Sequence, residues 1–166
     1  SPLNLRGSVR KARRAFRSLP VPASAAGDWR AEFAGPQWLR LLAPLGLNLS
    51  VLRGWYGKSF DDDGNAINLV RRNGQLQRVL PMRAGVRHSR LDGGLVLATH
   101  YGDDAPILLL RVSDEFRSID QDTLLGMMTI DLPAVRGLSL PFLLHRVASH
   151  SVVKTRNPRG RSPRGS

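Results

Sequence analysis

Side chains that could move a proton on a small molecule stand in two stretches. His100 and Tyr101 end an apolar segment, and Asp114 opens a charged run that ends at Arg117. A positioned imidazole, phenol or carboxylate can act as a general acid or base. If the protein is an enzyme, His100, Tyr101 and Asp114 are therefore its candidate catalytic residues.

The charged run favours an ion pair over a pair of catalytic carboxylates. Asp114 and Glu115 are adjacent in a segment that reads as a strand, so they face opposite sides of a sheet unless a bulge intervenes. We expect Lys58 or Arg117 to pair with one of these acids and close an end of the fold. The alternative is a site for the polar headgroup of a ligand.

The sequence predicts no metal site and no cofactor. It has no cysteine, and its four histidines, His88, His100, His145 and His150, lack the i, i+2 or i, i+4 spacing of a local metal site. No glycine-rich phosphate loop and no GxSxG motif occurs, so the sequence favours neither nucleotide binding nor esterase chemistry.

Regularly spaced turns predict the elements that must position these residues. Apolar and polar residues alternate in 27–33, and Asn73-Gly74 is a strong hairpin signal. Turn residues recur about every 8 to 12 positions and separate about nine strands, with Pro81 ending one of them. Apart from the segment at Trp55, these strands are 27–33, 66–72, 75–80, 84–90, 95–101, 107–117, 123–131 and 141–147.

Such a series predicts an all-β fold, an antiparallel meander closed into a small lipocalin-like barrel of about 8 to 10 strands. We expect the barrel to span 20–147. The preceding residues, 1–19, form a basic segment with a loosely docked or frayed helix at 8–18, and a short helix at 38–45 caps one mouth of the barrel. The basic tail, 148–166, has the composition of a disordered chain.

The net charge of +12 resides in the ends of the sequence. Eleven of the 25 lysines and arginines lie in 1–17 and 154–164, which contain no acid. This pattern predicts weak, non-specific contact with anionic lipid or nucleic acid through these two segments, and no sequence-specific reading of nucleic acid. No apolar run reaches membrane-spanning length and no signal peptide is evident, so we expect a cytoplasmic protein.

Three segments carry a family resemblance. Residues 27–31 approximate a GXWXG motif, residues 54–60 approximate a GWYGKxF segment, and residues 114–126 form an acidic, arginine-containing stretch that ends in Leu-Gly. The chain thus resembles the bacterial GXWXG proteins whose C-terminal half is a domain of unknown function, although Ala31 replaces the last glycine of the motif. The resemblance implies a calycin-like barrel and brings no biochemical role.

A barrel of this size either fills with side chains or holds one small ligand. We favour a non-catalytic protein that binds a small hydrophobic or amphipathic molecule, with Gly126 leaving room inside. The alternatives are a packed core, an isomerase, cyclase or hydratase acting in the same cavity, and an interaction module held to anionic surfaces by its basic ends. The candidate ligand-binding residues are Trp29, Trp55, Tyr56, Lys58, Tyr101, Arg111, Arg117 and Met128.

Overall fold

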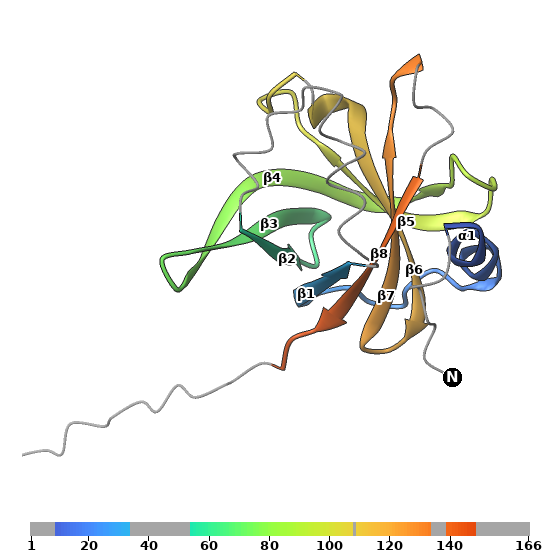
Figure 1. Cartoon of the computed structure of the whole chain (residues 1–166), viewed down its shortest axis with the longest axis horizontal. Helices are drawn as coiled ribbons and strands as arrows, with labels where there is room; N and C mark the ends of the chain where they lie inside the picture. Colours follow the sequence, from blue (N-terminus) through green and yellow to red (C-terminus); the bar gives the residue numbers. More distant parts are fainter. Residues whose placement is uncertain (1–8, 34–53, 108, 134–138, 149–166) are drawn as a thin grey trace, which may run out of the picture.

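Eight antiparallel strands close into one barrel in the computed structural model, which describes residues 9–33, 54–107, 109–133 and 139–148. Each strand pairs with the next in sequence, and β1 pairs with β8 to close the sheet (Figure 1). The all-β meander is confirmed. The strands are β1 (Gly27–Phe33), β2 (Trp55–Phe60), β3 (Asn65–Arg72), β4 (Gln75–His88), β5 (Leu95–Tyr101), β6 (Val112–Asp120), β7 (Thr123–Ile130) and β8 (Ser139–Arg146).

Strand β4 corrects the prediction that Pro81 ends a strand. The Asn73-Gly74 hairpin forms as predicted, with positive φ at both residues, but the strand after it continues through Pro81 to His88. Leu80 has φ 54°, and the β3–β4 register shifts beside Ile67. Proline lacks an N–H for the ladder and is tolerated at such a bulge. Two predicted strands are therefore one, and the expected nine become eight.

The start of β6 also differs from the prediction. The segment expected to begin a strand at Ile107 instead forms the short 3-10 helix η3 (Leu109–Arg111), after which β6 begins at Val112. The Leu109 amide donates to the Pro106 carbonyl at 2.8 Å, which tightens the chain into a turn. As a result, Arg111 lies outside the sheet and is exposed.

Helix α1 (Val9–Ser18) docks on the outside of the barrel through the apolar face expected for the segment 8–18. Ala12 and Phe16 are 0% and 1% exposed. They pack against outward-facing residues of β5 and β7, namely Val96, Ala98, Leu125 and Met127. The helix lies against the barrel wall in Figure 1. The predicted helix at 38–45 and the basic tail 149–166 lie outside the described residues.

Candidate functional site

A cluster of polar side chains lies inside the barrel. Lys58 on β2, Asn68 on β3, Tyr101 on β5 and Asp114 on β6 are all buried, with exposures between 1% and 7%. Successive strand residues point to opposite faces, and their apolar neighbours at i±2, such as Phe60 and Phe116, belong to the interior core. Burying polar groups in such a core is costly unless they are hydrogen-bonded.

Lys58 has partners for all three of its ammonium hydrogens. Its Nζ lies 3.0 Å from Asp114 Oδ2, 2.9 Å from Asn68 Oδ1 and 3.2 Å from the Met82 sulfur. The ring of Trp55 lies 5.6 Å away from the same nitrogen, within the range of a cation–π contact. This buried lysine is therefore both charge-balanced and saturated.

Asn68 connects the cluster. Its amide nitrogen donates to Tyr101 Oη at 3.0 Å and to the Leu80 carbonyl at 3.3 Å. Its carbonyl oxygen accepts from Lys58 and from the Trp55 indole N–H at 3.1 Å. An amide offers two donors and two acceptor lone pairs, so Asn68 is also saturated.

Tyr101 and Asp114 keep hydrogen-bonding capacity. The Tyr101 oxygen accepts from Asn68, but the described residues include no acceptor for its own hydroxyl hydrogen. Asp114 Oδ2 pairs with the Lys58 ammonium and accepts a hydrogen bond from the Thr99 hydroxyl at 3.5 Å. No described residue donates to Asp114 Oδ1. These two residues are 7% and 5% exposed, against 1% each for saturated Lys58 and Asn68. Burial raises the pKa of Tyr101, so its hydroxyl keeps its hydrogen at neutral pH.

Apolar side chains of partial exposure adjoin this cluster on the interior face. Thr99 pairs with Asp114 and with Ala84 across the sheet, and the next interior pair on β4 and β5 is Val86 with Leu97. Leu97 is half-buried, and Val86 is 60% exposed. The inner face of β4 and β5 thus runs from exposed apolar residues to the buried Asp114. Met128, directly opposite Asp114 on β7, is half-buried too.

Aromatic residues fill other parts of the interior. Trp29 is fully buried, its indole N–H donates to the Ala25 carbonyl, and the Arg146 guanidinium covers its ring at 4.3 Å. Trp29 therefore packs in the interior, where its register partner on β2 is Lys58. The expected space beside Gly126 is not there, because a Cβ at that position would lie 2.5 Å from the Phe142 ring.

Several predicted site residues lie elsewhere. His100 is exposed, since it alternates with the interior residues Thr99 and Tyr101. Arg111 is exposed on η3. Tyr56 lies beside a β-bulge, with the Arg71 guanidinium 5.1 Å from its ring. The structure therefore brings together Trp55, Lys58, Tyr101 and Asp114 with Met128, and leaves the other candidates outside the cluster.

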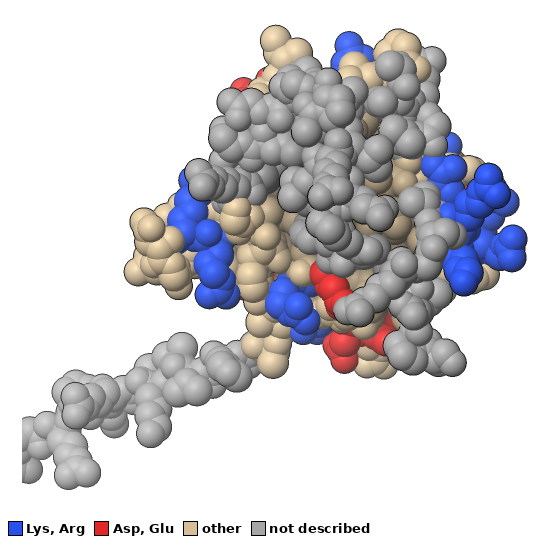
Figure 2. Space-filling view, viewed as in Figure 1, with Lys and Arg blue, Asp and Glu red and all other residues tan. Residues whose placement is uncertain are grey.

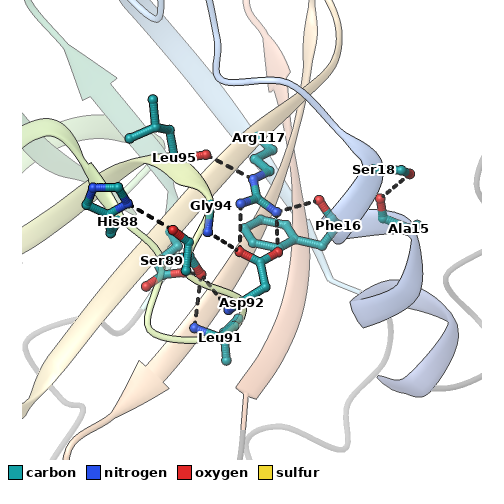
Figure 3. Close-up of polar contacts among 12 residues, drawn as sticks. Ala15, Phe16, Ser18, His88, Ser89, Leu91, Asp92, Gly94, Leu95 and Arg117 are labelled. Carbon is teal, nitrogen blue, oxygen red and sulfur yellow. Dashed lines mark hydrogen bonds and ion pairs between the residues drawn. The ribbon is translucent and has the colours of Figure 1, made fainter.

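Arg117 lies on the outer face, beneath the end of α1. Its guanidinium forms a two-pronged ion pair with Asp92, at 2.5 and 2.8 Å, and donates to the Phe16 carbonyl at 2.8 Å (Figure 3). Glu115 shares this face and accepts from Ser89 and from the Arg90 amide. Of the two cations expected to pair with Asp114 or Glu115, Lys58 does so, whereas Arg117 pairs with Asp92.

The outer surface of α1 is basic. Arg10, Lys11, Arg14 and Arg17 are exposed, and Figure 2 shows Lys and Arg side chains gathered over the helix. An open groove of about 410 Å³ adjoins it, lined by Arg17, Asp92, Gly94 and Arg117. The charge of α1 is thus presented on a docked helix. Residues 1–8 and the basic segment 154–164 lie outside the described residues, and contact with anionic partners stays a prediction.

Two negative findings apply to the described part of the chain. It has no group of three or more His, Cys, Asp or Glu side chains placed to hold a metal ion. Within the same residues, no helix has the length and hydropathy needed to cross a membrane.

Sequence reasoning did not single out Asn68, which hydrogen-bonds Trp55, Lys58 and Tyr101 from two other strands. The signal was present in β3, where Asn68 occupies the interior row between Ala66 and Val70. A polar residue in an apolar row of a strand marks a buried hydrogen-bonding site. The missing information was the partner, because Lys58 and Tyr101 come from other strands.

Comparison with known proteins supports the fold and brings no function. No family model and no curated protein matches the chain. A crystal structure of a protein from Thermomonospora curvata matches with a TM-score of 0.61 and 26% sequence identity, over 85% of this chain and 88% of that one. That protein is described without an activity. The resemblance to the GXWXG proteins stays a prediction, since none of these findings tests it.

Proposed function

We propose that the barrel binds a small amphipathic molecule in its interior. The observation that carries the proposal is a pair of groups with unused hydrogen-bonding capacity, the Tyr101 hydroxyl and Asp114 Oδ1, on two residues that are 7% and 5% exposed and adjoin the apolar core of the barrel. A hydrogen bond made with such a group contributes about 0.5–1.5 kcal/mol. A bound molecule whose polar end reaches both groups gains both hydrogen bonds.

The apolar part of the molecule has a surface to lie on. Leu97 and Met128 are half-buried members of the interior, and Ala84 and Val86 continue the apolar row toward the outside. Removing apolar surface from water contributes about 25 cal/mol per Å². Lys58 and Asn68 have no hydrogen-bonding capacity left for a ligand. In this arrangement they hold Tyr101 and Asp114 in position.

Native mass spectrometry of the protein purified from its own organism tests the proposal, followed by denaturing extraction of whatever is retained. We expect a stoichiometric apolar companion in the wild type and its loss in Leu97→Trp, which fills the interior row. Leu76→Trp is the matched control, because Leu76 is 46% exposed on β4. A companion kept equally by both variants would place the binding elsewhere.

The same two groups support a second candidate, an enzyme acting in this interior. Asp114 Oδ1 is free to accept a proton and the Tyr101 hydroxyl is free to donate one. With the extracted molecule as substrate, removal of a true acid by Tyr101→Phe lowers turnover by about 10²–10⁴-fold. A binder has no turnover to lose, so an unchanged molecule after incubation contradicts the enzyme.

A further inference from the structure

The donor and the acceptor of the interior cluster that have no partner narrow the choice of polar group that the ligand can carry. Tyr101 offers one hydrogen-bond donor, and Asp114 offers one acceptor, Oδ1. We infer, on the basis of the proposed function, that the ligand carries a neutral hydroxyl group which accepts from Tyr101 and donates to Asp114. The class of ligand is then an apolar alcohol rather than a fatty acid, an amine or a phosphate ester.

The saturated members of the cluster exclude the usual way of binding an anion. An anionic headgroup needs a lysine or arginine with free donors. The three hydrogens of Lys58 already face Asp114, Asn68 and Met82, and no other buried lysine or arginine belongs to the described interior. The buried Arg117 is on the outer face, engaged with Asp92. A carboxylate or phosphate would therefore meet Asp114 without a free cation.

The two groups lie in one electrostatic environment. The Tyr101 oxygen accepts from Asn68, the carbonyl oxygen of Asn68 accepts from Lys58, and Lys58 pairs with Asp114. The ion pair is thus close to Tyr101 and balanced in charge. A cationic ligand would upset this balance next to Lys58, and an ether or ketone accepts from Tyr101 but has no hydrogen for Asp114. A hydroxyl is the small group that serves both residues.

Calorimetric titration with four probes that share a decyl chain tests the inference: decan-1-ol, decyl methyl ether, decanoate and decylammonium. We expect decan-1-ol to bind at least about tenfold more tightly than each of the others, since each of these leaves Tyr101 or Asp114 Oδ1 without a hydrogen bond or adds an uncompensated charge. Decanoate binding as tightly as decan-1-ol would overturn the hydroxyl inference and leave the proposed function intact. Binding of none of the four would overturn both.

Tyr101→Phe provides the matched variant, because it removes the donor and keeps the ring. We expect Tyr101→Phe to weaken the binding of decan-1-ol by about 5- to 10-fold. The preference for decan-1-ol over decylammonium should also fall, because decylammonium does not use the Tyr101 donor. Tyr56→Phe is the control, since Tyr56 contacts Arg71 rather than the cluster. An unchanged affinity of Tyr101→Phe for decan-1-ol, with thermal unfolding showing a folded protein, would overturn the inference.

Discussion

The Lys58 ammonium lies 3.0 Å from the Asp114 carboxylate inside the barrel, where the two residues are 1% and 5% exposed. They come from β2 and β6, which are not neighbours in the sheet, so the pair spans the barrel interior. Desolvation of two charges offsets much of their mutual attraction, and such a pair is weak evidence for a purely stabilising role. Asp114 also keeps one oxygen without a donor among the described residues, and this is the group that the proposed ligand would reach.

Removing one member of this pair leaves the other as an uncompensated buried charge. We expect Asp114→Asn to lower the free energy of unfolding by about 3–5 kcal/mol. The double variant Lys58→Met with Asp114→Leu removes both charges, and we expect it to be more stable than the single variant. Urea denaturation measures both. Exposed Asp103→Asn is the control, and equal stability of Asp114→Asn and Asp103→Asn would contradict the buried pair.

Tyr101 gives the protein a distinctive response to alkaline pH. Because burial raises its pKa in the folded state, the unfolded chain loses the phenolic proton first, near the ordinary value of about 10. The stabilising contribution is complete below that pH and declines as the pH rises toward the folded-state value. We expect the free energy of unfolding to fall less steeply above pH 10 in Tyr101→Phe. The difference in ultraviolet absorbance between wild type and variant, followed against pH, reports the titration of Tyr101. A titration midpoint at or below about pH 10 would contradict the burial of Tyr101.

Arg117 anchors helix α1 to the barrel through contacts that lysine does not reproduce. Its planar guanidinium binds both Asp92 oxygens and also reaches the Phe16 and Leu95 carbonyls. We expect Arg117→Lys to destabilise the protein by about 1.5–3 kcal/mol and to speed hydrogen exchange of the α1 amides. Arg111→Lys, on exposed η3, is the matched control. Unaltered α1 exchange in Arg117→Lys would show that Ala12 and Phe16 suffice for docking.

Asp92 makes the docking of α1 sensitive to acid. Its hydrogen bond with Arg117 is the main reason that its pKa is lowered from 3.8 in the folded state. The contribution to stability is therefore complete above about pH 4 and is lost as the pH falls through the lowered value. We expect α1 exchange to rise below that pH in the wild type. In Asp92→Asn exchange is faster at neutral pH and changes less in acid, and parallel pH profiles for the two proteins would exclude this role.

Local sequence signals identified most of the barrel because strand alternation and turn residues act over a few positions. The hairpin at Asn73-Gly74 is predictable from these two residues alone. Pro81 ends a strand only where the sheet requires its missing N–H as a donor, and the bulge at Leu80 removes that requirement. The strand expected from Ile107 fails for a similar reason, since Pro106 accepts the Leu109 amide and starts a turn.

The site was predictable only in part, because its contacts join distant strands. Alternation correctly separates Asp114 from Glu115, and it also places Arg117 on the face of Glu115. It does not tell which face is interior. That choice depends on α1, whose Phe16 and Ala12 cover the Glu115 face, and on barrel closure, which brings Lys58 to Asp114. The partner of each charge is thus a property of the closed sheet.

Gly57 is required because the backbone of β1 passes directly over it. A Cβ at this position would lie 1.8 Å from the Trp29 carbonyl oxygen, which belongs to the neighbouring backbone and has no flexible end to move. We expect Gly57→Ala to disrupt the β1–β2 pairing beside Lys58 and to cost more than the about 1–3 kcal/mol typical of overpacking. Gly85→Ala is the control, since nothing lies within 4 Å of its added Cβ in the middle of β4. Chemical denaturation of both variants measures the difference, and a Gly57→Ala protein as stable as Gly85→Ala would mean that β1 and β2 lie farther apart than the structure shows.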